Sequence, residues 1–344
     1  MDMIEEKRKY WIDFLKIIAC LFVVVNHNLI YLFEYSGYNS FSHLFYSILM
    51  GIVKISIPLF LMITGYLLLS RNDNYEKIIK RIFRVLIPLV IMTIIYSFLY
   101  IEKGNITIFG VFKQFFKGPI NASLWYLYAL IGIYLCVPFI KRMIKGFKDK
   151  DYLFFLICFL ILPSFIPIIE KEFSLEVSDF FVAGSFPLIV SYLVAGIYLT
   201  KIKLNKKYFF ISILLFIVST VFSIFYMYKP YLEMGILSYF YDSWNNLFTV
   251  LSGLSFFYIF RYVFENKNFN ETLKNILGLG SNVSFGIYLI HVIISQLLFN
   301  SSFIKAIFLF NSYIGIVIFC IIAFVFSGAL VYCLKQVPVV KKFL

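Results

Sequence analysis

The sequence predicts an all-α integral membrane protein of about ten transmembrane helices. Of its 344 residues, 62% are hydrophobic and only 14% are charged, and the mean hydropathy is +0.90. This composition is far more apolar than that of a soluble domain. Apolar segments close to the roughly 20 residues that a spanning helix needs recur from one end of the chain to the other. We therefore expect residues 1–344 to form a single transmembrane domain.

Ten apolar segments mark the expected spans. They are residues 11–33, 44–69, 82–101, 122–140, 152–169, 183–200, 208–228, 247–264, 283–299 and 313–334. Glu5 and Glu6 precede the first segment and no small-residue cleavage pattern follows, so this helix is expected to remain in the protein. The connections are too short to hold a folded enzyme domain. Any chemistry is therefore expected within the helix bundle or at its mouths.

The basic residues predict how the chain lies in the membrane. The N-terminus, the connections after even-numbered spans and the C-terminus hold 23 of the 31 Lys and Arg residues, against six in the other connections. By the positive-inside rule, both termini are expected in the cytoplasm. The same asymmetry explains the net charge of +13 without nucleic acid as a partner, because anionic lipid attracts basic residues beside span ends.

Several kinds of chemistry find no support in the chain. Five cysteines are scattered through apolar segments without a CxxC pair, which indicates neither a disulfide framework nor a thiolate metal site. HExxH, the glycine-rich phosphate loop and GxSxG are all missing from the sequence. We therefore expect no metal and no tightly bound cofactor.

The first unusual stretch is KIIACLFVVVNH, which places Lys16 and His27 inside the first apolar segment. A lysine at the centre of a membrane helix costs roughly 2.5 to 3.5 kcal/mol. The two residues are eleven positions apart, which leaves them about 20° apart around a helix and about 16 Å apart along it. Asp13 and Cys20 fall on the same stripe. We expect the stripe to face the bundle interior; the alternative is a snorkelling lysine and a structurally hydrogen-bonded histidine.

A second intramembrane cation, Lys54, lies about ten residues into the second span, in KISIPLFLMITGYLL. Such a depth makes snorkelling difficult. Two roles remain open, namely neutralising an anion in a cavity or pairing with an acid such as Asp13 or Glu34. Pro58 and Gly65 are expected to kink this helix, since neighbouring helices can satisfy the freed backbone groups.

A third group, Lys77, Arg81 and Arg84, follows i, i+4, i+7 spacing at the start of the third span and forms one basic helix face. Arginines suit phosphate oxygens, which accept paired hydrogen bonds from the guanidinium group. On physical grounds alone, positive-inside anchoring is the stronger explanation. His291 lies about eight residues into the ninth span, where a structural hydrogen bond is the commoner role of a lone histidine.

Taken together, these stretches resemble the acyltransferase family 3 membrane proteins, which acylate bacterial surface polysaccharides and related molecules. The matching stretches are YWIDFLKIIACLFVVVNH, SIPLFLMITGYLL, RIFR, SLWYLYALIGIYLCVPFI, SYLVAGIYL and GSNVSFGIYLIHVII. The resemblance covers nearly the whole chain. The basic residue of the first motif is often arginine in the family and is Lys16 here, which keeps the charge but loses bidentate geometry. The chain resembles the standalone members, which carry no soluble esterase-like domain.

The resemblance implies transfer of an acyl group, usually acetyl, from cytoplasmic acyl-CoA to a hydroxyl of a glycan or lipid-linked sugar. The RIFR stretch matches the family's RxxR motif, which is thought to engage the CoA donor. The expected donor-binding residues are Lys54, Lys77, Arg81 and Arg84. Supporting residues are expected at Asp13, Glu34, Trp125, Tyr288 and His291. Acyl-CoA is then a substrate, and the expected location is the plasma membrane of a bacterium.

We therefore expect a membrane O-acyltransferase in which His27 is the general base for the acceptor hydroxyl or part of an acyl relay, while Lys16 steadies the donor. Histidine suits this role because its ordinary pKa lies close to neutral pH. Direct transfer and an acyl-enzyme both remain open. Along the helix, Asp13 lies about 21 Å from His27 and Glu34 about 10 Å. Any group that orients the imidazole must therefore come from another helix.

Two other classes of protein are the alternatives. A polysaccharide transporter or flippase would arrange ten spans as two inverted repeats, with binding at helices broken near the midplane. The first span argues against this arrangement because it has no Gly or Pro between Trp11 and Phe33. A structural or sensory scaffold would not require Lys16, His27 and Lys54 within the membrane.

Overall fold

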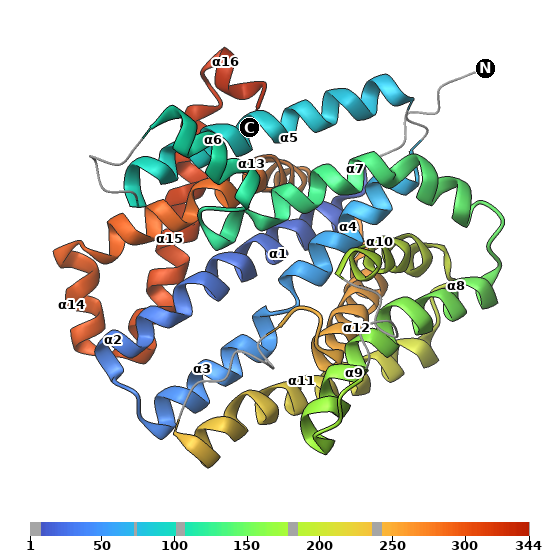
Figure 1. Ribbon diagram of the computed structural model, residues 1–344, viewed down its shortest axis with the longest axis horizontal. Helices are drawn as coiled ribbons and strands as arrows, with labels where there is room; N and C mark the ends of the chain where they lie inside the picture. Colours follow the sequence, from blue (N-terminus) through green and yellow to red (C-terminus); the bar gives the residue numbers. More distant parts are fainter. Residues whose placement is uncertain (1–7, 72–73, 101–106, 178–184, 236–242, 344) are drawn as a thin grey trace.

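The computed structural model describes residues 8–71, 74–100, 107–177, 185–235 and 243–343, and this part of the chain is helical without any strand. Figure 1 shows the helices packed into one bundle. They are α1 (Tyr10–Asn28), η1 (Leu29–Tyr31), α2 (Leu32–Ser36), α3 (Ser40–Val53), α4 (Ser56–Leu69), α5 (Tyr75–Tyr100), α6 (Ile108–Lys117), η2 (Ala122–Leu124), α7 (Trp125–Ile144), α8 (Asp149–Leu156), η3 (Ile157–Ile161), α9 (Leu162–Phe173), α10 (Ser185–Lys201), α11 (Lys206–Met234), α12 (Leu247–Phe264), α13 (Glu271–Phe299), α14 (Ser302–Phe310), α15 (Ser312–Leu334) and α16 (Pro338–Lys341).

The predicted fold class is confirmed, because nine helical segments in the described ranges are long and apolar enough to cross a membrane. α10 is a tenth, shorter apolar helix, and it occupies the place of the sixth expected span. Each of the other nine expected spans overlaps one of the long segments. Residue 101 and residues 183–184, at the ends of two expected spans, lie outside the described residues.

The relative direction of α1 and α13 supports counting α10 as a crossing. Lys16 Nζ donates to the carbonyl oxygen of Ser281 at 2.8 Å, and the rings of His27 and His291 lie 5.2 Å apart. Contacts therefore advance in the same direction along both helices, so α1 and α13 run parallel. Successive crossings of the membrane alternate in direction, so two parallel helices must be an even number of crossings apart. α1 and α13 meet this condition only if α10 is counted as one of the crossings between them.

Both ends of the described chain lie at the same end of the bundle. Arg8, just before α1, contacts the carbonyl oxygen of Gly278 near the start of α13. Lys335, just after α15, donates to the carbonyl oxygen of Asn282 at 2.6 Å. Two chain ends on the same side of the bundle require an even number of crossings, which agrees with ten. The cytoplasmic position of that end stays a prediction from the positive-inside rule.

The second span is divided into α3 and α4 by a break at Lys54 and Ile55, which Figure 1 shows as two separate helices. Pro58 explains the position of the break. Because proline has no backbone N–H, the carbonyl group of Lys54 one turn earlier loses its helical partner. α4 then runs without interruption through Gly65.

α4 and α10 cross at very short range through two glycines. A Cβ atom added to Gly65 would lie 2.1 Å from the carbonyl oxygen of Leu193, and one added to Gly196 would lie 2.0 Å from that of Met62. No side chain fits at either position without moving the two backbones apart. The glycines belong to MITGYLL and LVAGIYL, two of the matching stretches, so these stretches pack against each other.

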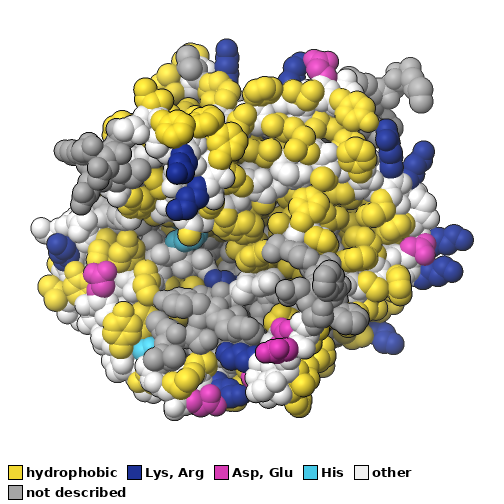
Figure 2. Space-filling model, in the orientation of Figure 1, with side chains coloured by type: hydrophobic (Ala, Val, Ile, Leu, Met, Phe, Trp, Pro, Cys, Tyr) yellow, Lys and Arg dark blue, Asp and Glu magenta, His cyan; other side chains and the backbone are white. Residues whose placement is uncertain are grey.

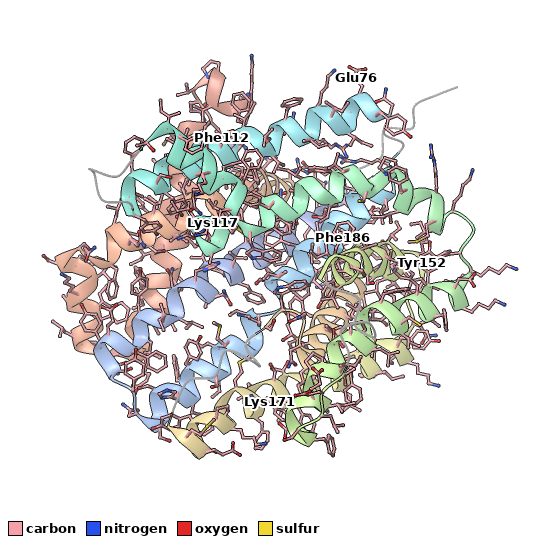
Figure 3. The ribbon with its side chains drawn as sticks, viewed as in Figure 1. Glu76, Phe112, Lys117, Tyr152, Lys171 and Phe186 are labelled. Atoms are coloured by element: carbon pink, nitrogen blue, oxygen red, sulfur yellow. The ribbon has the colours of Figure 1, made fainter. Side chains whose placement is uncertain are left out.

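The outer surface suits contact with lipid. Figure 2 shows hydrophobic side chains over most of one face of the molecule, with many of the Lys and Arg side chains toward its edges. α6, on which Figure 3 labels Phe112 and Lys117, has no buried residue and leaves Ile108 93% exposed. Its apolar face and its lysines are typical of a helix that lies in the membrane interface.

Candidate active site

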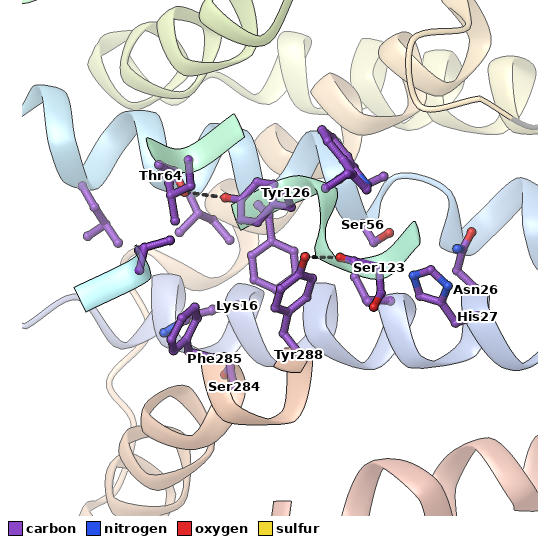
Figure 4. Close-up of a pocket in the computed structure, with 18 of the residues that line it drawn as sticks. Lys16, Asn26, His27, Ser56, Thr64, Ser123, Tyr126, Ser284, Phe285 and Tyr288 are labelled. Carbon is purple, nitrogen blue, oxygen red and sulfur yellow. Dashed lines mark hydrogen bonds between the residues drawn. The ribbon is translucent and has the colours of Figure 1, made fainter. Parts of the chain in front are cut away.

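A cavity of about 270 Å³ lies between α1, α4, α5, α7 and α13. Figure 4 shows its wall, in which polar groups are spaced along a mainly apolar surface. Five of the residues predicted from the sequence line this one cavity, although they come from four different helices. They are Lys16, His27, Arg84, Trp125 and Tyr288.

The polar stripe of α1 faces α13. Lys16 is held by its hydrogen bond to the carbonyl oxygen of Ser281, and Cys20 Sγ lies 3.5 Å from the carbonyl oxygen of Ser284. An ammonium group has three donors, so this single bond to Ser281 leaves Lys16 capacity for a ligand. Figure 4 shows Lys16 and His27 at opposite ends of the cavity along α1.

The neighbour of His27 is a second histidine. The His291 ring on α13 lies 5.2 Å from the His27 ring, centre to centre, at an angle of 49°. His291 Nδ1 lies 2.7 Å from the carbonyl oxygen of Tyr288. A carbonyl can only accept, so Nδ1 carries a proton, and Nε2 of a neutral His291 is an acceptor. Nε2 is buried and has no hydrogen-bond partner among the described residues.

Lys54 is connected to the cavity through Asn26. Its Nζ donates to Oδ1 of Asn26 at 3.2 Å, and Asn26 lines the cavity beside His27. Because Oδ1 accepts this bond, the amide NH₂ group of Asn26 is oriented away from Lys54 and remains a donor. The break after α3 thus brings Lys54 to the His27 end of the cavity.

The opposite wall is made of hydroxyl and aromatic groups. Thr64 and Tyr126 are hydrogen-bonded at 3.0 Å, and the Tyr288 hydroxyl donates to the carbonyl oxygen of Ser123. Trp125, the first residue of α7, stacks on Trp244 with ring centres 5.5 Å apart. These contacts fix the aromatic rings, so the cavity has a defined shape.

The three residues of the basic face at the start of α5 lie in different surroundings. Arg84 lines the cavity together with Tyr134, whereas Arg81 does not line it. Lys77 is exposed and does not line this cavity. A role in donor binding stays a prediction for all three basic residues.

The two acidic candidates lie away from His27. Asp13 accepts a hydrogen bond of 2.6 Å from Arg8 Nε, which raises the pKa of Arg8. Glu34 is exposed on α2 and does not line the cavity. The structure therefore brings His291, and neither carboxylate, beside the imidazole of His27.

Asn26, Ser56 and Ser123 line the cavity but were not predicted from the sequence. Asn26 could have been predicted as a site residue, because an amide directly before His27 in an otherwise apolar run is unusual. Ser56 and Ser123 could not be recognised from the sequence, since small hydroxyl residues are common in membrane helices. Among the described residues, no three His, Cys, Asp or Glu side chains gather as metal ligands.

Comparison with known proteins gives one match. Residues 9–332 match the family model described as the acyltransferase domain, which covers nearly the whole chain. No curated protein and no solved structure matches the chain. The match agrees with the family that the sequence motifs indicate.

Proposed function

The chain belongs to this acyltransferase family and is a multi-pass membrane acyltransferase, and we propose that it moves an acetyl group from cytoplasmic acetyl-CoA to a hydroxyl of a cell-surface polysaccharide or lipid-linked glycan in a bacterial plasma membrane. The observation that carries the proposal is the single cavity that Lys16, Arg84 and His27 line together. Lys16 and Arg84 lie toward one end of this cavity and His27 toward the other. A long thioester with an anionic end needs cations at that end and a base beside its reacting carbonyl group.

His27 is the general base in this proposal. Its imidazole removes the proton of the acceptor hydroxyl, and the hydroxyl oxygen attacks the thioester carbonyl carbon. The carbon–sulfur bond then breaks, and the imidazolium returns the proton to the departing thiolate, so that the products are the ester and free CoA. Such a positioned base contributes about 10² to 10⁴ in rate.

His291 positions His27. A base needs one ring nitrogen free for the hydroxyl proton, so its other nitrogen must carry a hydrogen. Nε2 of His291 has no hydrogen-bond partner among the described residues, and with the ring centres 5.2 Å apart it accepts that N–H once the His27 ring turns toward it. The two carbonyl groups near Nδ1 fix the His291 tautomer. The same bond would stabilise the imidazolium when His27 takes the proton.

Asn26 supplies a donor for the charge that develops on the thioester oxygen. Its amide NH₂ lies in the wall next to His27 and is oriented by the Lys54 bond to Oδ1. The ammonium of Lys54 polarises the amide, which strengthens it as a donor. A preorganised donor of this kind contributes about 10² to 10³ in rate.

The alternative function, a polysaccharide transporter, finds one favourable observation in the break between α3 and α4, since transporters bind cargo at broken helices. Mass spectrometry of surface glycans from cells with and without the gene separates the two functions. An acyltransferase changes the mass of the glycan, by that of an acetyl group in the proposed case. A transporter changes the amount of glycan and leaves its mass unaltered, which would refute the proposal.

A further inference from the structure

A second cavity, of about 400 Å³, continues from the candidate active site toward the end of the bundle where the described chain begins. We call it the vestibule. Its wall combines the start of α1, the end of α4 and part of α13, and includes Arg8, Lys9, Asp13, Lys16 and Arg71. Lys16 and Leu67 line both cavities, so the two spaces adjoin at these residues.

The vestibule carries an excess of positive charge. Four cationic side chains face it, against one carboxylate among its described wall residues. That carboxylate, Asp13, is already paired with Arg8. Lys9 lies 3.7 Å from Glu265, a weak contact, and its ammonium group lies 5.3 Å from the centre of the Tyr66 ring.

Arg71 is the most available of the four cations. It is exposed, and its guanidinium has no acidic partner within the described ranges. Arg71 lies in the wall of the vestibule, and Arg84 lies in the wall of the adjoining active-site cavity.

The two adjoining cavities suit an elongated ligand that has an anionic end and an apolar end. The vestibule is basic, whereas the active-site cavity beyond Lys16 is mainly apolar. Lys16 and His27 are about 16 Å apart along α1, which suits a slender arm between the polar end and the reacting thioester. A carrier protein would dock on an exposed surface, whereas a basic pocket that opens at the end of the bundle suits a small phosphorylated group.

We propose that the vestibule binds the phosphate groups of the donor's nucleotide through Lys9 and Arg71, and so selects a nucleotide-bearing thioester over shorter thioesters and acyl carrier proteins. The proposal rests on the acyl transfer proposed above. Lys9 and Arg71 lie outside the basic face of α5, so this role is separate from that of Arg81 and Arg84.

The test compares two donors with purified protein in lipid nanodiscs. Acetyl-CoA carries the nucleotide, whereas acetyl-pantetheine has the same thioester and arm without any phosphate. Arg71→Gln and Lys9→Gln should each lower kcat/KM for acetyl-CoA about 10-fold, the scale of one charge-assisted hydrogen bond, and leave kcat/KM for acetyl-pantetheine unchanged. Lys80→Gln is the control, because Lys80 is exposed on α5 and paired with Glu76. Equal losses with both donors, or no loss with acetyl-CoA, would overturn the proposal.

A binding measurement separates this proposal from the proposed reaction. Adenosine 3′,5′-bisphosphate, the nucleotide part of CoA, should bind the wild-type protein in calorimetry and bind the Arg71→Gln variant about 10-fold more weakly. If this difference is found and no donor supports transfer, the vestibule assignment stands and the reaction is wrong. If the nucleotide does not bind, or binds both proteins equally, the vestibule assignment is wrong even where transfer occurs. An equal affinity that varies only with the anionic lipid content of the nanodisc would assign the basic residues to lipid phosphates.

Discussion

Replacing Gly65 with alanine tests whether the glycine crossing of α4 and α10 holds the active-site wall in place. The added Cβ would lie 2.1 Å from the Leu193 carbonyl oxygen, whereas ordinary contact begins at 3.4 Å, so the helices must separate by about 1.3 Å. Overpacking of this kind typically costs 1 to 3 kcal/mol. α4 also carries Ser56 and Thr64 of the cavity wall, and a displacement of about 1 Å at a catalytic site can lower the rate about 10²-fold.

Gly132→Ala is the matched control, because it is also a helical glycine but its Cβ would meet only a Phe186 ring atom at 3.7 Å. Thermal unfolding in detergent and the rate of acyl transfer are measured for both variants. We expect Gly65→Ala to unfold at a lower temperature and to lose most activity, and Gly132→Ala to match the wild type. If Gly65→Ala is as stable and as active as Gly132→Ala, the close crossing is wrong.

Three further predictions follow from the site and the topology. Arg84→Ala should raise KM for acetyl-CoA about 10-fold, the scale of a lost charge-assisted bond, whereas Lys77→Ala should leave it unchanged; equal effects would contradict the division of the basic face. Asn26→Leu should lower kcat about 10² to 10³-fold with little change in KM, and a raised KM at normal kcat would count against its role at the oxyanion. In a background lacking Cys333, an impermeant thiol reagent added to intact cells should label Ser302→Cys and spare Lys203→Cys; the reverse pattern would invert the predicted orientation.

The spans and the stripe of α1 could be predicted because both depend on local sequence. Hydropathy over about 20 residues locates a membrane helix, and the helical repeat alone places Lys16 and His27 on one face. Which helix meets that face is not a local property. His291 is more than 260 positions from His27 in the sequence, and no periodicity in either segment indicates that α1 and α13 run side by side.

Span two shows a similar limit. Pro58 predicts a disturbance of the helix, and its missing N–H explains why the break falls one turn earlier, at Lys54. The contact of Lys54 with Asn26 depends on how α3 and α4 pack against α1, which the sequence does not determine. Gly65 was expected to contribute to a kink, but its physical role, a close approach to α10, becomes visible only with the partner helix in place.

The central claim is that His27 is the general base of acyl transfer, and the rate of the chemical step in a His27→Gln variant tests it most directly. The variant is purified, shown to bind CoA as the wild type does, and assayed for acetyl transfer from acetyl-CoA to the glycan acceptor in nanodiscs. His43→Gln is the control, since His43 is buried against Tyr231 on α11 and lines no part of the cavity. We predict that His27→Gln loses about 10² to 10⁴ in rate while His43→Gln stays active. Transfer by His27→Gln at the wild-type rate would contradict the catalytic assignment and leave His27 as a hydrogen-bonded packing residue.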